Sequence, residues 1–295
     1  MYIPEVVSLF DGASMAQVAL RKANIGYGRY QAAEIDKHAI AVAQSNFPET
    51  QQIGDVRTVS GAELGQPGLL LAGSPCQGFS FSGKGLNFND PRSKLFFEFV
   101  RILEESNPQY WLLENVVMKK EHQDVISGIL GVEPVKLNSA LTSAQNRVRL
   151  YWANFPITEP EDQHWALQDV IQASTMRHPA AVRGRRAHPN QPVVQWLEVR
   201  SESPDAKSNC LTTVAKDTVV TSLPKGKYPD AFARKLPFRN YTTVERCRLM
   251  NLPDDYCRGV STNQAVKITG NGWETGMITH IFECLTKHAT FTLKN

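Results

Sequence analysis

Residues 69–85, LLLAGSPCQGFSFSGKG, are the stretch around which the chain is organised. The apolar run predicts a buried strand, and the small residues after it predict a turn that presents Cys76 at the carboxyl end of the strand, where open α/β sheets bind ligands. Pro75 fixes its own φ and favours an extended Ser74, so the approach to Cys76 is stiff. The glycines and serines that follow predict a mobile loop, which suits a nucleophile that a loop covers. For a lone Pro-Cys pair, a buried cysteine before an ordinary loop would be the better interpretation.

Predicted strands and helices alternate through the first part of the chain. Strands are expected at 5–10, 30–35, 69–73 and 110–113, and helices at 15–23, 37–46 and 94–106. This alternation indicates an α/β domain built on a parallel sheet. Further along, the pattern predicts strands at 135–141 and 147–155, helices at 165–173, 241–250 and 277–288, and a glycine turn at 269–273.

Polar residues follow the first strands. The turn DGAS, 11–14, precedes a predicted helix, an arrangement that lets a nucleotide-like ligand approach the main chain and the helix amino end. Glu34 follows the second strand, where an acid can bind both hydroxyls of a ribose, or else it favours the start of the next helix. Asp55 either accepts a hydrogen bond from an adenine amine while Val56 packs on the ring, or is a turn residue.

Charged residues also lie near the later strands. Glu114 follows the apolar run 110–113, and this desolvated position suits a general acid. Gln145, Arg147, Arg149 and Tyr151 recur at period two, which predicts that they share one face of a strand. Two arginines on one face meet either acids, as salt bridges, or phosphate and base oxygens.

Positive charge is concentrated in one segment. The 295-residue chain has a net charge of only +3, yet residues 173–240 contain twelve Lys or Arg against five Asp or Glu, a net +7 that leaves −4 for the remainder. This asymmetry fits a phosphate-contacting segment, although a solvated basic face gives the same count. The segment is rich in proline and glycine, with strands predicted only at 193–199, 210–214 and 217–222, which indicates a small substrate-recognition domain.

The cellular setting is predicted from what the sequence does not display. No secretory signal is visible, nor any apolar run long enough to cross a bilayer. The cysteines other than Cys76 have no spacing typical of a zinc site or a disulfide framework, so we expect no metal. These features predict an intracellular, cytoplasmic protein, nucleoid-associated if bacterial or phage, whose Cys76 stays a free thiol.

Eight segments, in this order, carry a resemblance to the DNA (cytosine-5) methyltransferase family: SLFDGAS, EID, GDV, GSPCQGFS, LENVV, QNRVRLYW, YTTVERCRLMNLPDDY and TGNGW. The basic segment falls where that family carries its target-recognition domain, and SNCLTT, 208–213, is similar to the Thr-Leu element of that domain. FDG, LFFEF, ENVVM and Trp273 resemble the branch that includes the mammalian de novo enzymes. The first turn lacks the paired glycines of bacterial relatives, and Asn271-Gly272-Trp273 replaces their Asn-Ser-Val.

The resemblance implies an architecture and partners. Residues 1–172 and 241–295 would form a Rossmann-like methyltransferase sheet with helices on both faces, and 173–240 a small, loop- and strand-rich target-recognition domain. The implied cofactor is S-adenosyl-L-methionine, which leaves as S-adenosyl-L-homocysteine, and the implied partner is double-stranded DNA. A cognate restriction endonuclease is a further candidate partner, no membrane is expected, and we expect a monomer.

The resemblance also implies roles for individual residues. Cys76 would attack carbon 6 of a cytosine flipped out of the duplex, and Glu114 would protonate ring nitrogen 3 so that carbon 5 can accept the methyl group. Arg149 would hold the carbonyl oxygen of the base, and Arg147 would meet a phosphate. The implied cofactor residues are Phe10, Ala13, Glu34, Ile35, Asp55, Val56, Pro75, Leu95, Asn271, Gly272 and Trp273. The implied DNA-binding residues are Ser82, Arg147, Lys207, Thr212 and Thr213.

Three alternatives stay open. Some members of the family modify tRNA, but they carry a Cys-Phe-Thr element that is absent here. A catalytically silent, DNA-binding relative would usually have lost the nucleophile or the acid, whereas Cys76 and Glu114 are both present. A Rossmann-type oxidoreductase would carry the dinucleotide fingerprint, which the first turn does not match.

Overall fold

The structure, a computed structural model, describes residues 1–74, 94–185 and 193–292, and it divides into two compact units. The first unit comprises Met1–Leu137, Val148–Glu159 and Ile278–Asn295, and the second comprises Asn138–Arg147 and Pro160–Met277. Each unit is therefore assembled from separate stretches of the chain. The predicted recognition segment, 173–240, lies wholly inside the second unit.

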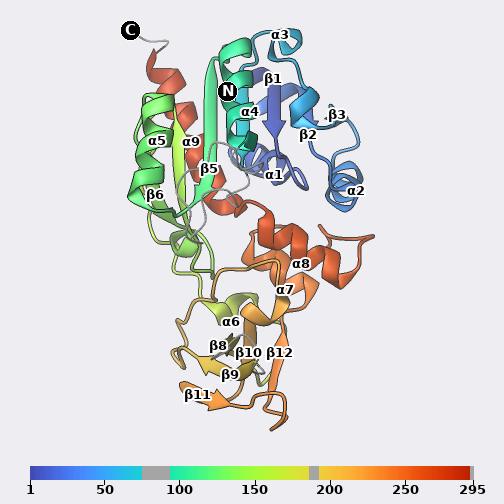
Figure 1. The fold of residues 1–295 in the computed structure, drawn as a ribbon, viewed down its shortest axis with the longest axis vertical. Helices are drawn as coiled ribbons and strands as arrows, with labels where there is room; N and C mark the ends of the chain where they lie inside the picture. Colours follow the sequence, from blue (N-terminus) through green and yellow to red (C-terminus); the bar gives the residue numbers. More distant parts are fainter. Residues whose placement is uncertain (75–93, 186–192, 293–295) are drawn as a thin grey trace. The chain divides into compact units, whose positions relative to one another are not determined.

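The first unit is built on a seven-stranded sheet (Figure 1). Its strands, in spatial order, are β3 (Gln51–Gln52), β2 (Gly26–Ala33), β1 (Tyr2–Leu9), β4 (Leu69–Gly73), β5 (Tyr110–Val116), β7 (Val148–Ala153) and β6 (Val135–Asn138). The strands from β3 to β5 pair in parallel, and β7 runs antiparallel to β5. The predicted α/β fold class is confirmed.

The strand order of this sheet sets where a ligand binds. The chain leaves β1 for β2 on one side and later returns to pair β4 on the other side of β1. Parallel sheets bind ligands at the carboxyl ends of the strands on either side of such a reversal. The turn after β1 and Ser74 after β4 occupy these two positions.

Helices cover the sheet of the first unit. They are α1 (Met15–Lys22), α2 (Lys37–Asn46), α3 (Gly61–Leu64), α4 (Lys94–Ser106), α5 (Lys120–Leu130) and most of α9 (Thr275–Thr292). Phe96, Phe99 and Ile102 recur at helical spacing in α4 and are buried in one cluster with strand residues such as Leu70 and Leu113. Residues on the opposite face of the same strands, such as Leu69 and Leu112, are also fully buried, as expected for a sheet covered on both sides.

The second unit contains a five-stranded antiparallel sheet, drawn in Figure 1. Its order is β11 (Gly226–Pro229), β9 (Val194–Val199), β8 (His178–Arg185), β10 (Val219–Thr221) and β12 (Phe238–Asn240). Alternate strand residues, including Val182, Leu197 and Val219, are buried together on one face. This small sheet fits the predicted recognition domain, because every strand of it lies within 173–240.

Helices of the second unit are α6 (Leu167–Val170), α7 (Thr243–Leu249) and α8 (Thr262–Asn271). The Thr242 side chain accepts a hydrogen bond from the Glu245 amide, and the Glu245 carboxylate accepts one from the Thr242 amide. This capping box satisfies two main-chain donors at the start of α7, as the sequence predicts.

Several predicted elements need correction. The predicted helix 165–173 shrinks to α6, the predicted strand 210–214 does not form, and the end of the predicted strand 135–141 is a 3-10 turn, Ser139–Leu141. The predicted glycine turn 269–273 is wrong in its first half, because Thr269, Gly270 and Asn271 end helix α8. Gly270 is required there by close packing: a Cβ on it would lie 2.4 Å from the carbonyl carbon of Thr212.

Candidate active site

Glu114 and Arg149 form an ion pair inside the first unit. Arg149 Nε lies 2.9 Å from Glu114 Oε1, and only 13% and 12% of the two side chains are exposed. The pairing of β5 with β7 sets this contact, since Glu114 stands opposite Tyr151 and Val116 opposite Arg149. The strand β5 runs past the predicted end at residue 113, so the carboxylate is fixed by strand pairing on both sides. The predicted acid and one predicted arginine are thus brought together.

The strand that leads to Cys76 is tied to this pair. Gly73, the last residue of β4, pairs with Glu114 in the parallel register. One residue further on, the Ser74 hydroxyl accepts a hydrogen bond of 3.0 Å from Asn115 Nδ2, and both residues are buried. This contact was not predicted, although Asn115 follows Glu114 in the segment LENVV. Pro75, Cys76 and Ser82 lie outside the described residues.

The first turn and the end of β2 form a second polar site in the first unit. The Gly12 amide donates a 2.8 Å hydrogen bond to Glu34 Oε2, and the amides of Ile35 and Asp36 each donate one of 2.8 Å to Oε1. Phe10 has a φ of 57° and Ser14 one of 58°, so the main chain turns sharply between β1 and α1. Glu34 is therefore fixed beside the turn that the sequence predicts for a nucleotide-like ligand.

The apolar surroundings of Glu34 fit a nucleoside. Ile35 is 71% exposed, an unusual state for a large apolar side chain next to a fixed carboxylate. Ala13 and Val56 are buried, and Phe10 and Leu95 pack partly buried against the apolar core. A carboxylate can accept hydrogen bonds from ribose hydroxyls, and an exposed aliphatic side chain next to it can contact a base. This combination suits the nucleoside half of S-adenosyl-L-methionine.

Asp55 is engaged with its own turn. Its side chain caps a short 3-10 turn, Val56–Thr58, and both carboxylate oxygens bind the Arg57 guanidinium. Hydrogen bonds from Arg57 hold the pKa of Asp55 at about 2, below its ordinary value of 3.8. The carboxylate is therefore charged at neutral pH. Its predicted contact with an adenine amine stays a prediction.

Asp11 is a functional candidate that the sequence analysis missed. It accepts hydrogen bonds from Ser14 Oγ and, at 2.6 Å, from the Tyr30 hydroxyl. Burial raises its pKa from 3.8 to about 6, against the lowering effect of these hydrogen bonds, and the nearby Glu34 carboxylate adds to the rise. The one available signal was its position beside Gly12 in the first turn.

Arg147 belongs to the second unit, although it lies two residues from Arg149. Arg147 is only 3% exposed, and its guanidinium donates to the main-chain oxygens of Leu211 (3.2 Å), Gly270 (3.2 Å) and Gly272 (2.7 Å). The two arginines do not share a strand face, because β7 begins at Val148 and Arg147 precedes it. The predicted phosphate contact of Arg147 stays a prediction.

The other predicted site residues of the second unit lie close in sequence to Leu211 or Gly272, whose main-chain oxygens accept hydrogen bonds from Arg147. Gly272 caps the end of α8, after Asn271 and before the half-buried Trp273. The Thr212 hydroxyl bonds Asp217, and Thr213 is exposed. Lys207 is half-buried, and its ammonium is bound by main-chain oxygens.

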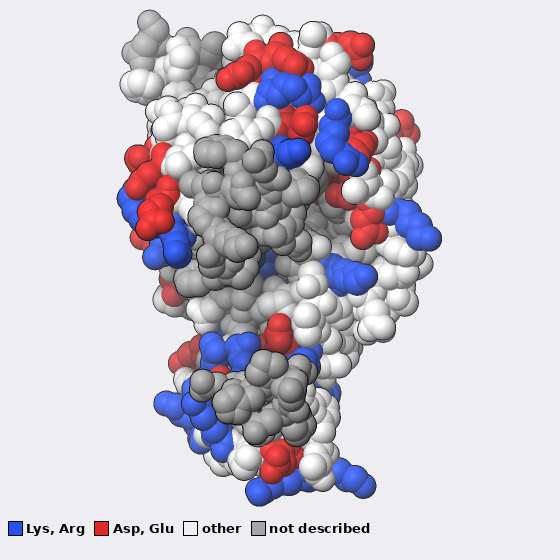
Figure 2. Space-filling view, in the orientation of Figure 1, with Lys and Arg blue, Asp and Glu red and all other residues white. Residues whose placement is uncertain are grey.

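Exposed positive charge accompanies the small sheet. Figure 2 shows lysine and arginine side chains gathered over the second unit. The exposed cations of the described part of 173–240 are Arg177, Arg200, Lys216, Lys225, Lys227, Arg234 and Lys235, and the exposed acids there are Glu202, Asp205 and Asp230. Cations in excess over acids on an exposed surface attract phosphates.

The described residues contain neither a membrane-spanning helix nor a metal-binding group of side chains. In residues 1–74, 94–185 and 193–292, no helix is long and apolar enough to cross a membrane. Nor does that part of the chain contain a group of three or more His, Cys, Asp or Glu side chains that could hold a metal ion.

The fold is an α/β fold that solved methyltransferase structures also have. The chain is similar to the solved structure of the Entamoeba histolytica methyltransferase EhMeth, with a TM-score of 0.72, 16% identity and coverage of 96% of this chain and 98% of that one. It is also similar to the S. pombe Dnmt2 methyltransferase, with a TM-score of 0.64, 20% identity and coverage of 96% and 98%. At these identities the likeness concerns the fold.

Sequence comparisons indicate the family that the chain is similar to. Residues 5–131 match the model of the C-5 cytosine-specific DNA methylase family. The chain is 31% identical over 189 residues to the orphan methyltransferase M.SPRI of Bacillus phage SPR, a match that covers 58% of this chain and 43% of the relative. It is 26% identical over 294 residues to the type II methyltransferase M.NgoBI of Neisseria gonorrhoeae, covering 90% and 88%. These matches confirm the resemblance to the C-5 cytosine-specific DNA methylase family that the motifs indicate, and residues 5–131 are the part that matches the family model.

The matches differ in how much of each relative they span. The chain spans less than half of M.SPRI and 22% of the orphan methyltransferase M.Rho11sI of Bacillus phage rho11s.

Proposed function

We propose that the protein methylates carbon 5 of cytosine in double-stranded DNA, with S-adenosyl-L-methionine as the methyl donor. The observation that carries the proposal is the ion pair of Glu114 with Arg149, next to the end of β4, from which the chain leads to Cys76 within two residues of Ser74. A nucleophile, a carboxyl group and a guanidinium are the groups that activation of a cytosine ring requires.

Each residue has a defined task in this scheme. The Cys76 thiolate forms a bond to carbon 6 of the flipped-out cytosine, and Glu114 delivers a proton to ring nitrogen 3, which moves the electron pair toward carbon 5. Carbon 5 then acquires the methyl group. Loss of the carbon-5 proton to solvent, return of the nitrogen-3 proton to Glu114 and departure of the Cys76 thiolate restore the neutral aromatic ring. Arg149 holds the carbonyl oxygen of the base and keeps Glu114 in place.

The cofactor is assigned to the turn after β1 and the end of β2. Glu34 would accept the ribose hydroxyls, while Ile35 and Val56 would contact the adenine. Phe10, Ala13, Asp55, Pro75 and Leu95 would complete the part of the site contributed by the first unit. Asn271, Gly272 and Trp273 are also proposed as cofactor residues, on the strength of the motif resemblance alone. When bound, the cofactor supplies an electrophilic methyl group.

Double-stranded DNA is the proposed substrate because of the exposed cations around the small antiparallel sheet. Thr212 and Thr213, with Ser82 from the loop after Cys76, are proposed to contact it. Type II methyltransferases are among the proteins that the chain is similar to, and this suggests a cognate restriction endonuclease as partner. The protein would act inside the cell, as a monomer.

The first experiment incubates the protein with radiolabelled S-adenosyl-L-methionine and undermethylated duplex DNA, with tRNA and a Cys76→Ala variant in parallel. We expect label in DNA cytosine and none with the variant, and base-resolution sequencing of the product would give the recognition sequence. Label in tRNA alone would show that the substrate is tRNA and not DNA. Cofactor binding without transfer to either nucleic acid would contradict the proposed activity.

A further inference from the structure

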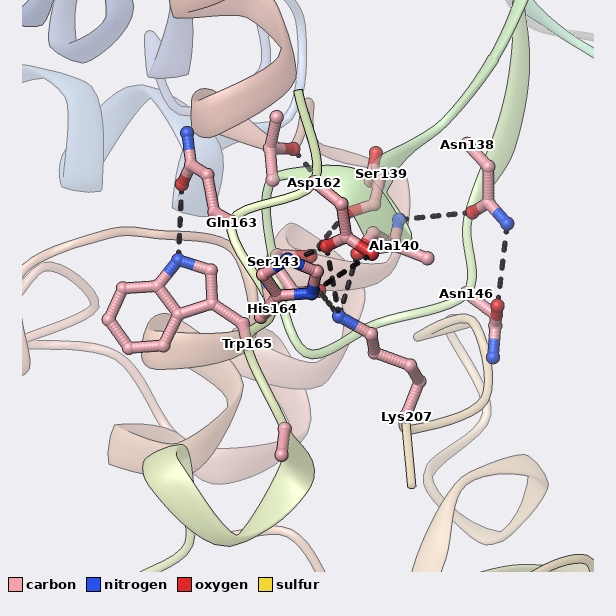
Figure 3. Close-up of polar contacts among 12 residues, drawn as sticks. Asn138, Ser139, Ala140, Ser143, Asn146, Asp162, Gln163, His164, Trp165 and Lys207 are labelled. Atoms are coloured by element: carbon pink, nitrogen blue, oxygen red, sulfur yellow. Dashed lines mark hydrogen bonds and ion pairs between the residues drawn. The ribbon is translucent and has the colours of Figure 1, made fainter. Parts of the chain in front are cut away.

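Lys207 has its ammonium group enclosed within the second unit (Figure 3). Its Nζ donates a 2.8 Å hydrogen bond to the main-chain oxygen of Ala140 and one of 3.4 Å to that of Ser143. Asp162 Oδ1 lies 4.0 Å away, and 18% of the lysine side chain is exposed. Two of the three donors of the ammonium are thus hydrogen-bonded to main-chain oxygens, and the Asp162 carboxylate lies at ion-pair distance.

The turn that Lys207 binds is the 3-10 turn Ser139–Leu141, at the start of the segment 138–147. Figure 3 shows the lysine side chain reaching into this turn, with Asp162 beside the same ammonium. The turn is closed by its own main-chain bonds, from the amides of Thr142 and Ser143 to the oxygen of Ser139. Lys207 therefore fastens the side of a turn that is already formed.

Residues that follow Lys207 pair with the other end of the same segment. The Ser208 amide donates to the Ala144 oxygen at 2.7 Å, and the Asn146 amide donates to the Ser208 oxygen at 2.9 Å. Gln145, which is fully buried, accepts a 2.8 Å hydrogen bond from the Leu211 amide and donates one of 2.9 Å to the Leu249 oxygen. Segments 138–147 and 207–211 are thus joined along their length.

Arg147 is at the far end of this joined pair. One of its main-chain acceptors is the Leu211 oxygen, and its own amide donates to Asn138 Oδ1 at 3.0 Å. Asn138 Oδ1 also accepts from the Ala140 amide at 3.1 Å, so one side chain links the turn that Lys207 binds to the arginine. A displacement of the turn would therefore be transmitted to Arg147.

We infer that Lys207 is a positioning residue, which fixes the turn Ser139–Leu141 and through it Arg147, and that it does not contact a DNA phosphate. Burial lowers the pKa of Lys207, against the effect of Asp162, as expected for an ammonium withdrawn from solvent. The inference rests on the proposed function only in what Arg147 does for methyl transfer. The structural role of Lys207 stands on the second unit alone.

The two roles predict different responses to salt. A lysine that neutralises one phosphate contributes about 0.9 to the slope of log K for DNA binding against log salt concentration. A positioning lysine contributes nothing to this slope itself, but its loss misplaces Arg147, which lowers kcat on the order of 10-fold to 100-fold and also lowers the slope if Arg147 meets a phosphate. The decisive measurements are therefore kcat and the order of segment 138–147, read beside the salt slope.

The variants are Lys207→Met, Lys207→Arg and, as the matched control, Lys267→Met, which removes an exposed lysine of helix α8. We expect Lys207→Met to lower kcat, whereas a lysine that only neutralises a phosphate would lower the salt slope and leave kcat unchanged. Lys207→Arg should not restore kcat, because a planar guanidinium cannot reproduce the contacts of a compact ammonium among main-chain oxygens. Lys267→Met should behave as the parent protein.

Hydrogen exchange gives a readout that does not depend on activity. We expect Lys207→Met to increase exchange at the amides of Thr142, Ser143 and Asn146, while Lys267→Met leaves them protected. If Lys207→Met does not fold, Lys207→Arg and Asp162→Asn provide the same comparison. A salt slope lower by about one, with kcat and exchange unchanged, would overturn the inference. Absence of methyl transfer by the parent protein would contradict the proposed function, and the exchange data would still decide the role of Lys207.

Discussion

The guanidinium of Arg149 lies beside the carboxylate of Glu114, with Nε 2.9 Å from Oε1, across the antiparallel pair β5 and β7. Both side chains are almost nine-tenths withdrawn from solvent, so each neutralises a charge that would be costly alone. The pair is therefore a structural contact. In the proposed reaction, its Glu114 carboxyl group also delivers the proton that activates the base.

Glu114→Gln tests the proton-delivering role. The amide keeps the size of the side chain and a hydrogen-bond acceptor for Arg149, but it cannot donate a proton of comparable acidity. We expect kcat for methyl transfer to fall on the order of 100-fold to 10,000-fold, with DNA binding little changed. Steady-state kinetics on duplex DNA would measure this, and a variant with full kcat would rule out Glu114 as the acid.

Arg149→Met tests the structural side of the same contact. Removing the cation leaves a mostly buried carboxylate without its partner, so we expect the free energy of unfolding to fall by about 3 kcal/mol. In the double variant with Glu114→Gln the loss should be smaller than the sum of the two single losses. Denaturant titration of the four proteins gives the coupling energy, and strict additivity would show that the two side chains do not interact.

Asp11 should make stability depend on pH. Burial raises its pKa to about 6 in the folded protein, while an unfolded chain titrates it near 3.8. Between these values the folded state binds more protons, so stability falls as the pH rises from about 4 to about 6 and stays low above that. The difference is at most about 3 kcal/mol, because part of the residue reaches solvent.

Asp11→Asn removes this titration. The stability of Asp11→Asn relative to the parent protein should therefore increase as the pH rises across the same window, and other titrating groups cancel in the comparison. Asp205→Asn, at an exposed position of the second unit, is the control. Parallel curves for Asp11→Asn and the parent would show that Asp11 has an ordinary pKa.

Replacing glycine by alanine should have opposite effects on stability at Gly270 and at Gly128. A Cβ on Gly270 would lie 2.4 Å from the carbonyl carbon and 2.6 Å from the carbonyl oxygen of Thr212, so we expect Gly270→Ala to destabilise the protein by about 1–3 kcal/mol. Gly128 lies exposed in helix α5 with nothing within 4 Å of such a Cβ. Gly128→Ala should stabilise by about 0.5–1 kcal/mol. Thermal unfolding of both variants would test the packing of α8.

Cys284 should react with alkylating reagents at neutral pH. Burial is the largest single influence and opposes ionisation of the thiol, but the hydrogen bonds with His280 and Thr158 together outweigh it and lower the thiol pKa to about 7. The alkylation rate should therefore rise with a midpoint near pH 7, and His280→Ala should move that midpoint upward. Peptide mapping after iodoacetamide treatment separates Cys284 from the other cysteines, with the fully buried Cys247 as the unreactive reference.

Most of the longer strands and helices of the first unit could be predicted because their signals are local, but helix α5, Lys120–Leu130, and the short α3 and β3 were missed. Helix α4 begins and ends where its apolar spacing predicts, at Lys94 and Ser106, and the parallel strands are short apolar runs. Helix α8 was missed because Gly270 was taken as a turn signal. In the structure the same glycine allows close approach of residue 212, a reason that depends on the tertiary contact.

The candidate site was predictable in its residues and less so in its pairings. Glu114 and Arg149 were both identified, yet their contact depends on the register of β5 with β7, which no local pattern specifies. The period-two pattern wrongly grouped Arg147 with Arg149, because the strand begins between them at Val148. Asp11 and the Ser74–Asn115 contact depend on burial and on neighbouring strand ends, and neither can be read from one sequence.

The chain crosses between the two compact units four times, after residues 137, 147, 159 and 277. By contrast, every strand of the small antiparallel sheet lies in the single uninterrupted stretch 173–240. Neither unit can be expressed by simple truncation, but the sheet can be exchanged by cutting the gene at only two places. If the proposed function holds, a swap of this one cassette between relatives would be a short engineering route to a new target sequence; it would leave Glu114 and Arg149 in place but would also exchange Lys207 and Leu211, which contact segment 138–147 and Arg147.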